Sequence, residues 1–166
     1  MATTSWDEIV GMVEAAAKRA KPGEWIVGRG WHQEKWTTRP EPSVEGFPTH
    51  ASLDRVSPEN PVYLSHASGH ASIANARAMA LAGVTRRTPN PPGGEILKDA
   101  SGDPIGVFRE TASGLIGSAR AESRATMTPE EIEAEALEII WLADRDCLSK
   151  GLTTVHTAGE SFSTID

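Results

Sequence analysis

The sequence predicts an α/β protein in which helices alternate with short strands. With 166 residues and 39% apolar content, the chain can build one hydrophobic core but falls short of the ~250 residues of a full eight-stranded barrel. Two stretches, beginning at Ser5 and Thr128, carry helix-start signals followed by apolar residues at helical spacing. Short β-prone runs separated by proline and glycine stand between them. These three observations favour a single domain of mixed structure.

The first expected helix begins at Ser5, because Ser5 and Glu8 form a capping box. Apolar residues then recur at helical spacing, namely Trp6, Ile9, Val10, Val13, Ala17 and Ala20. Pro22 and Gly23 end this helix. The following run, Glu24 to Trp31, predicts a buried strand whose glycines permit a sharp turn or a close backbone approach.

A proline-rich stretch from Thr37 to Asn60 predicts a long loop with a short turn of helix around Ser52 to Val56. Loops longer than ~12 to 15 residues are usually functional or disordered. Trp31 and Trp36 stand at the entrance of this loop, and tryptophans pack against other groups. We therefore expect an ordered loop.

The middle of the chain predicts a second strand, "PVYLSH", followed by a helix from Ala71 to Leu81 that Gly83 terminates. The turn sequence "DASGD" then separates two β-prone runs, Glu95 to Lys98 and Ile105 to Arg109, as in a β-hairpin.

The second long helix is expected from Thr128 to about Ser149, because Thr128 and Glu131 form another capping box with Pro129 at the first helical position. The run "LTTVHTAG", Leu152 to Gly159, predicts a third strand buried on both faces. A helix that leads into a buried strand is typical of α/β packing.

Composition excludes several classes of function. The formal charge is -7, with 23 acidic and 16 basic residues, so we expect neither a nucleic-acid partner nor binding to an anionic membrane. The single cysteine, Cys147, excludes an intramolecular disulfide and every multi-cysteine zinc pattern. Because there is also no signal peptide or apolar stretch of ~18 residues, a cytoplasmic location is expected.

Two histidines four residues apart, His66 and His70, raise the question of a metal site. On one helix they would share a face as zinc ligands do, but Ser68 and Gly69 between them favour a strand end and a turn. A zinc site also needs a third protein ligand. The pair is therefore interpreted as a junction, and two readings of His70 stay open, a ring that faces a cleft or a structural hydrogen bond.

Four other residues are candidates by position. His156 would lie at the end of a buried strand, where parallel sheets place catalytic groups, and a satisfied core histidine is the alternative. Glu110 stands at the end of the hairpin, and two interpretations stay open, a ligand or base in a site and a solvated carboxylate. Trp31 and Gln33 would line an apolar pocket with a polar anchor, or pack in the core.

Several spaced blocks together resemble the YtcJ-like family of metal-dependent amidohydrolases, in the amidohydrolase superfamily. The resemblance runs from about Trp6 to Gly159. The blocks are "EWIVGRGWHQEKW", "SLDRVSPENPVYLSHASGHASIANARAMALAGV", "TPNPPGGEILKDASGDPIGVFRE" and "GLTTVHTAG".

The resemblance implies a fragment of a (β/α)8 hydrolase barrel that binds one or two divalent metals, usually zinc, and hydrolyses C–N bonds of amides or cyclic amides with metal-activated water. Residues 1–127 would be an N-terminal helix and the mixed α/β insertion that follows the first barrel strand, and residues 128–160 a helix and the second barrel strand. The family's metal ligands would then lie outside this chain, so we expect no tightly bound metal and an inactive segment.

The substrate-pocket candidates that the resemblance transfers are Trp31, Gln33, His70, Asn75, Glu110 and His156. A small amide-type molecule is the implied substrate. Two positions depart from the family's pattern, with Ser68 in its "DGH" and Thr157 in its "VHDAG".

Two other classes of function remain open. The chain could be a non-enzymatic interaction module, or one half of a split hydrolase that needs a complementing chain. Exposed edges of an incomplete sheet would also favour self-association.

Overall fold

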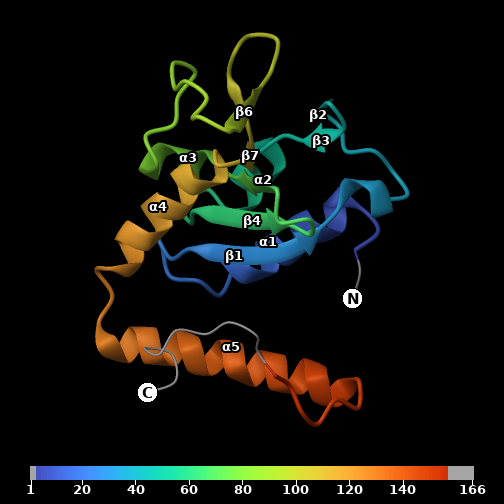
Figure 1. The fold of residues 1–166 in the computed structure, drawn as a ribbon, viewed down its shortest axis with the longest axis vertical. Helices are drawn as coiled ribbons and strands as arrows, with labels where there is room; N and C mark the ends of the chain where they lie inside the picture. The colour runs from blue at the N-terminus through green and yellow to red at the C-terminus, as the bar shows by residue number, and fades with distance from the viewer. Residues whose placement is uncertain (1–2, 157–166) are drawn as a thin grey trace. The chain divides into compact units, whose positions relative to one another are not determined.

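The computed structural model describes residues 3–156, which divide after Arg124 into two compact units, each considered by itself (Figure 1). The helices are α1 (Trp6–Ala17), α2 (Ala51–Val56), α3 (Ala76–Leu81), α4 (Ser113–Arg124) and α5 (Pro129–Ser149), with a 3-10 turn at Gln33–Lys35. Within residues 3–156 none of the helices combines the length and apolarity that a membrane crossing requires.

The first unit is built on a five-stranded sheet in the order β1-β4-β5-β7-β6. Its strands are β1 (Ile26–Trp31), β4 (Val62–His66), β5 (Ala71–Ala74), β6 (Gly94–Lys98) and β7 (Pro104–Glu110). Strands β1 and β4 are parallel, whereas the β4–β5, β5–β7 and β6–β7 pairs are antiparallel. A separate two-stranded hairpin is formed by β2 (Ser43–Val44) and β3 (Phe47–Pro48).

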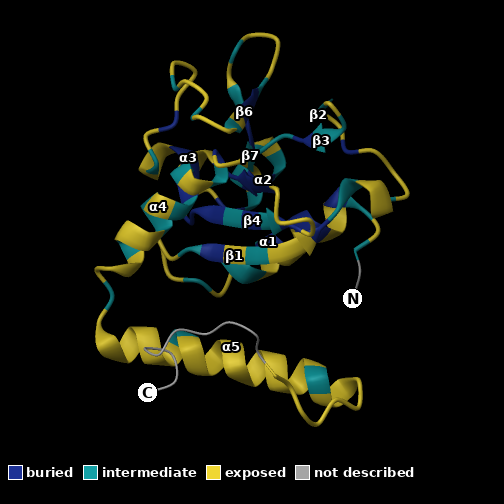
Figure 2. Cartoon of the chain, viewed as in Figure 1, coloured by how far each residue is buried: buried dark blue, intermediate teal, exposed yellow. Residues whose placement is uncertain are grey.

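Helices lie on both faces of this sheet, whose strands contain many buried residues (Figure 2). The buried side chains form two hydrophobic clusters. Side chains of α1 and α2 pack on one face against Leu64 and Val107. Side chains of α3 and α4 pack on the other face against Phe108, the neighbour of Val107 on β7. Successive residues of a strand point to opposite faces, so the central strands β4, β5 and β7 contribute to both clusters.

The local sequence signals of this unit predict several of its elements correctly. Helix α1 begins after Ser5, whose side chain accepts a hydrogen bond from the Glu8 amide. The hairpin around "DASGD" forms as β6 and β7, and the short helix in the proline-rich stretch forms as α2. The tryptophans at the loop entrance are packed as expected, and their partners include each other, since the rings of Trp31 and Trp36 stack with their centroids 6.1 Å apart.

The prediction of one helix from Ala71 to Leu81 was wrong in its first half. Ala71–Ala74 form strand β5, which pairs with β4 on one side and β7 on the other, and all four residues are buried. Alanine has a high intrinsic helix propensity, but two neighbouring strands supply hydrogen bonds that a short isolated helix cannot match. Helix α3 begins only after Asn75.

Two other expectations about this unit need correction. Strand β1 is not buried throughout, because it lies at the edge of the sheet and Val27 is 46% exposed. Helix α4 is not predicted from the sequence, because Ser113–Arg124 contains few apolar residues. In the structure, Ile116 is the buried residue of this helix.

The second unit contains α5, whose Thr128 cap, Glu131 contact and leading Pro129 form the expected capping box. The strand expected from Leu152 does not form over residues 152–156, and these residues, including His156, are exposed. A strand needs a neighbour for its N–H and C=O groups, and no strand in the described chain pairs with them. The rest of that expected strand, residues 157–159, lies outside the described residues.

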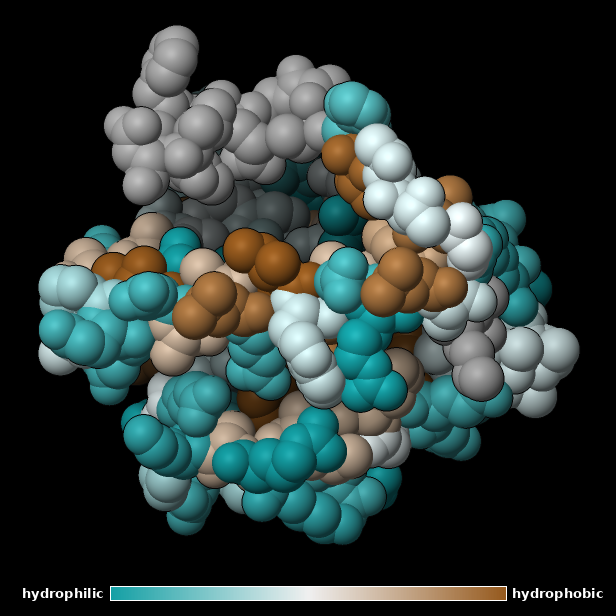
Figure 3. Space-filling view, turned by 90° about the horizontal axis from the view of Figure 1, so that it is seen from below, coloured by the Kyte–Doolittle hydropathy of each residue, from teal (hydrophilic) through white to brown (hydrophobic). Residues whose placement is uncertain are grey.

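Hydrophobic side chains on α5 are exposed to a degree unusual for a folded domain (Figure 3). Those more than half exposed are Leu137, Ile139, Ile140, Trp141, Leu142 and Leu148.

Candidate functional site

One end of the five-stranded sheet carries the last residues of β1, β4 and β7 and the first residues of β5 and β6. Trp31, the last residue of β1, is opposite His66, the last residue of β4. Because β5 runs antiparallel to both of its neighbours, its first residue, Ala71, lies at this end and pairs with Arg109 of β7. The register therefore brings the residues that follow β1 and β7 close to the turn between β4 and β5.

The turn between β4 and β5 is held by hydrogen bonds from three consecutive backbone amides. The Ser68 amide donates to His66 Nδ1 at 3.1 Å, and the His70 amide donates to Ser68 Oγ at 3.1 Å. Between them the Gly69 amide donates to the His66 carbonyl at 3.0 Å. Gly69 has φ +78°, a conformation that glycine adopts without strain. The backbone that carries His70 is thus defined by its own turn.

The His66 imidazole lies in the interior of this end of the sheet and is 8% exposed. Its Nε2 is 3.0 Å from Gln33 Oε1 in the 3-10 turn after β1. Its ring meets Trp31 edge-on and lies near His32, each at a centroid distance of 4.6 Å. Burial lowers the pKa of His66, and the neighbouring His32 lowers it further, so this imidazole favours the neutral form.

His70 and Glu110 form an exposed pair above this turn. His70 Nδ1 lies 3.0 Å from Glu110 Oε2, and the Glu110 amide donates to the His70 carbonyl at 2.8 Å. Their side chains are 70% and 55% exposed, so both reach the surface. Glu110 has φ +50°, a conformation that costs free energy for any residue except glycine.

Arg109 fixes the chain just before this pair. Its guanidinium donates to Glu45 at 2.7 Å and to Glu95 at 2.9 Å, and it lies 5.0 Å from the centre of the Phe47 ring. The two carboxylates raise the pKa of Arg109 against the opposing effect of its partial burial. This arginine connects the β2–β3 hairpin to the end of β7.

The predicted site residues are only partly brought together. Gln33, His70 and Glu110 lie at this end of the sheet, where Gln33 contacts His66 and His70 contacts Glu110. Trp31, the last residue of β1, donates its indole N–H to the Leu64 carbonyl at 3.0 Å. Asn75 lies at the opposite end of β5, fully buried. His156 belongs to the second unit and is exposed.

Asn75 has a structural task in the first unit. Its Oδ1 accepts from the amides of Val62 and Ala78, and its Nδ2 donates to the carbonyls of Ser57 and Asn60. All of its polar capacity is therefore used inside the protein, where it joins the start of β4 to the start of α3.

The hydrogen-bonded cluster at this end of the sheet consists of Gln33, His66, Ser68, His70 and Glu110. Two of its members, His66 and Ser68, are not among the predicted site residues. From the sequence, His66 is interpreted as part of a strand-end junction rather than as a metal ligand, and Ser68 as part of the turn after it and as a departure from a family pattern. The sequence contains a usable signal for Ser68, since a serine two residues after a histidine in a tight turn can bond to backbone amides.

The described residues do not form a metal centre. In residues 3–156 no group of three or more histidine, cysteine, aspartate or glutamate side chains is placed to hold an ion. His70 and Glu110 offer two donors, whereas a catalytic zinc site takes three protein ligands. This part of the chain therefore does not fit a metal by itself.

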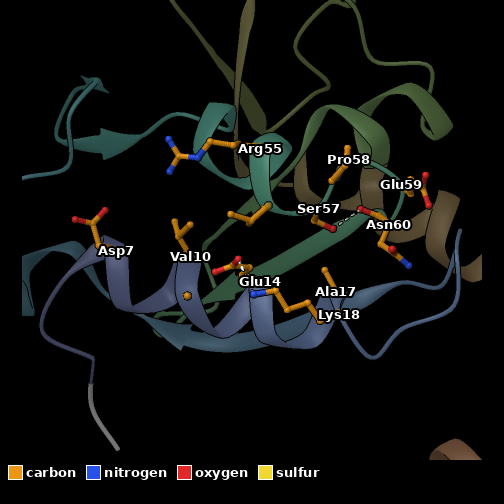
Figure 4. Close-up of a pocket in the computed structure, with 12 residues that line it drawn as sticks. Asp7, Val10, Glu14, Ala17, Lys18, Arg55, Ser57, Pro58, Glu59 and Asn60 are labelled. Carbon is orange, nitrogen blue, oxygen red and sulfur yellow. Dashed lines mark hydrogen bonds and ion pairs between the residues drawn. The ribbon is translucent and has the colours of Figure 1, made fainter.

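Two hollows in the described part of the chain lie away from this cluster. A groove of about 790 Å³ runs between α1 and the end of α2, with Glu14 and Lys18 on α1 and Arg55 on α2 (Figure 4). A smaller hollow of about 260 Å³ lies between α1 and β1 and includes Trp31. Neither hollow is lined by His66, His70 or Glu110.

The mixed α/β fold has a counterpart among solved structures. It is similar to part of an uncharacterized metal-dependent hydrolase from Pyrococcus furiosus, with a TM-score of 0.54 and 22% sequence identity. The match covers 93% of this chain and 26% of the hydrolase.

Sequence comparison assigns the family, because residues 1–166 match the amidohydrolase family throughout. The chain is 33% identical over 161 residues to the putative amidohydrolase YtcJ of Bacillus subtilis (strain 168), covering 97% of this chain and 28% of that protein. It is 36% identical over 152 residues to the N-substituted formamide deformylase of Arthrobacter pascens, covering 92% and 26%.

A third relative is Protein LONG AFTER FAR-RED 3 of Arabidopsis thaliana, which is 34% identical over 157 residues, or 94% of this chain and 24% of that protein. The chain belongs to the amidohydrolase family and spans about a quarter of the length of these relatives.

Proposed function

We propose that this chain is part of a metal-dependent amidohydrolase that hydrolyses C–N bonds of small amides or cyclic amides, other than peptides, with metal-activated water. Within that enzyme residues 1–127 are an N-terminal helix and an insertion between the first and second strands of a (β/α)8 barrel, and residues 128–160 are a helix and the second barrel strand. Zinc is the expected metal, and it supplies a water of lowered pKa. The expected location is the cytoplasm.

The single observation that carries a role in the pocket is the conformation of Glu110. A glutamate at φ +50° is uncommon and unfavourable, and such residues cluster at functional sites. Here the strained backbone places the carboxylate against His70 on the surface of the sheet end. The only described side-chain partner of Glu110 is the exposed His70. Exposed ion pairs stabilise a fold weakly, so this contact does not offset the cost of the backbone conformation.

The role that follows for this pair is to form one wall of the substrate pocket. The carboxylate orients the imidazole through Nδ1, as carboxylates do for histidines that exchange protons or hydrogen-bond a substrate. Gln33 adds an amide that contacts His66, and the Trp31 ring packs against the same imidazole. We propose that this wall contacts the amide-type substrate, and that Asn75 and His156 serve the fold or other parts of the enzyme.

The isolated chain is proposed to be inactive, because its described residues offer no complete metal site. Elemental mass spectrometry of purified protein tests this, together with an assay on N-substituted formamides and cyclic amides. The expected result is substoichiometric metal and no turnover. One equivalent of zinc together with turnover would overturn the proposal.

The pocket wall is tested in an active enzyme. A chimera in which this chain replaces the matching quarter of the N-substituted formamide deformylase would carry His70→Ala or Glu110→Gln. Loss of a proton-transfer or positioning group predicts a fall in kcat/KM of more than about tenfold at unchanged metal content. Lys98→Gln, on the far edge strand β6, is the matched control and should retain activity. Full activity of both pocket variants would refute the pocket wall.

A second candidate is one half of a split hydrolase, and the exposed apolar side chains of α5 favour it. A complementing chain, or a second copy, would cover Ile140 and Trp141, which are 63% and 54% exposed. Sedimentation velocity distinguishes the cases, since a monomer that keeps its sedimentation coefficient over a wide concentration range argues against self-association.

A further inference from the structure

The hydrogen bonds around His66 determine which of its ring nitrogens carries a proton. The Ser68 backbone amide can only donate, and it points at Nδ1 from 3.1 Å. Nδ1 must therefore be an unprotonated acceptor. In the neutral ring the proton then lies on Nε2, where it donates to Gln33 Oε1 at 3.0 Å.

The second bond at Nδ1 connects His66 to the candidate pocket wall. Ser68 Oγ lies 2.7 Å from Nδ1 and donates its hydroxyl proton there, while it accepts the His70 amide at 3.1 Å. A continuous path of hydrogen bonds thus runs from Gln33 through His66 and Ser68 to the backbone of His70, whose ring binds Glu110.

Protonation of His66 would break this path at one identifiable bond. A hydrogen on Nδ1 would face the Ser68 amide hydrogen, and a backbone amide cannot reverse its direction. The Ser68 hydroxyl can turn and accept instead, so only the amide contact would become repulsive. The turn between β4 and β5 would then lose the first of its three amide bonds.

The surroundings of His66 oppose that protonation. The titratable group that faces it from the segment after β1 is His32, whose ring is 4.6 Å away and whose Nδ1 accepts the Glu34 amide. Trp31, the last residue of β1, and Gln33 after it have uncharged side chains, and Glu110 and His70 lie across the turn. Of these groups only Glu110 is a carboxylate, and it contacts His70.

We infer that His66 is the positioning residue of the candidate pocket wall: as a neutral, Nε2-protonated imidazole it holds Ser68 and, through Ser68, the His70–Glu110 pair. The role of that pair in substrate binding rests on the proposed function, whereas the tautomer and its effect on the turn do not. His66 itself touches no substrate. Acidification past the titration of His66 loosens the turn and displaces His70.

The experiment is an NMR titration of the whole ¹⁵N-labelled chain from pH 8 to pH 4.5. Long-range ¹H–¹⁵N spectra are expected to show His66 as the Nε2–H tautomer at pH 8. The amides of Ser68 and His70 are expected to shift in one step with the same midpoint as the His66 ring. An Nδ1–H tautomer, or amides that do not follow the His66 ring, would overturn the inference.

Two variants separate positioning from general stability. The amide oxygen of His66→Asn can occupy the place of Nδ1 and does not titrate, so Ser68 and His70 should keep their pH 8 shifts and lose the acid step. His66→Phe keeps an aromatic ring without the acceptor, so both amides should move at every pH. If Asn and Phe behave alike, the hydrogen bond is not what positions the turn.

The functional arm uses the chimera described above. There His66→Asn should shift the acid limb of the kcat/KM profile to lower pH at unchanged metal content. If the chimera is inactive or insensitive to His70, the proposed function fails while the NMR result can still stand. An active, His70-dependent chimera with an unchanged acid limb would instead refute the positioning role.

Discussion

His70 and Glu110 lie 40 residues apart in sequence, yet His70 Nδ1 is 3.0 Å from Glu110 Oε2. The contact depends on β5 and β7 being antiparallel neighbours, so that the residue before β5 meets the last residue of β7. It also depends on the left-handed backbone of Glu110. An energetically unfavourable conformation that serves an exposed contact is a reason to look for function there.

The strain at Glu110 predicts an unusual order of stabilities. Glu110→Gly should be more stable than Glu110→Ala by about 1 kcal/mol, because glycine adopts positive φ without a Cβ clash. Both variants lose the His70 contact, so the difference between their free energies of unfolding reports the cost of the backbone conformation alone. Urea denaturation measures it.

The control is Glu95 on β6, where the strand backbone is ordinary. There the order should reverse, with glycine less stable than alanine by about 0.5–1 kcal/mol. The same order at both sites would contradict the strain.

Asn75→Ala should cost about 3 kcal/mol of unfolding free energy. The side chain is fully buried, and its loss leaves two amides and two carbonyls short of partners at the start of β4 and α3. Asn90→Ala is a milder comparison, since Asn90 accepts a single bond from the Ile96 amide. Equal losses for the two variants would show that the buried network is not essential.

His66 predicts a loss of stability in weak acid. Its folded pKa is lowered, so the unfolded chain, with an ordinary histidine pKa near 6.5, binds the proton more tightly. The contribution of His66 to the free energy of unfolding should be constant above about pH 6.5. It should be lost as the pH falls below that value. Thermal unfolding from pH 8 to pH 5 measures the effect.

The control for this prediction is His66→Asn, which should make the thermal stability less dependent on pH between pH 6.5 and pH 5. The pKa values of Glu8 and Glu14 are also lowered, by hydrogen bonds from Thr4 and Lys18, but these carboxylates titrate from an ordinary value of 4.5. Their contribution is therefore lost at lower pH, and a slope that survives in His66→Asn would have another source.

Arg109→Lys should release the β2–β3 hairpin. A lysine cannot bridge Glu45 and Glu95 as the planar guanidinium does, nor stack equally well on Phe47. Hydrogen exchange of the amides in residues 43–47 should become faster, whereas exchange of the amides in the central strand β4 should not change. Arg29→Lys, on the exposed edge strand β1, is the matched control and should leave the hairpin unchanged.

The sequence by itself determined the elements whose signals are local. The caps at Ser5 and Thr128 define the starts of α1 and α5, and the turn "DASGD" defines the hairpin, because each depends on residues within one or two turns of chain. The blocks that resemble the YtcJ-like family also pointed to amidohydrolases, and the family match agrees.

Only the tertiary structure decided the elements that depend on neighbours. Ala71–Ala74 became a strand because β4 and β7 flank it, whereas residues 152–156 did not, since no described strand pairs with them. The same long-range pairing brought Gln33, His70 and Glu110 to one end of the sheet and left Asn75 at the other. Backbone hydrogen bonds between distant segments decide such cases, and local propensity does not encode them.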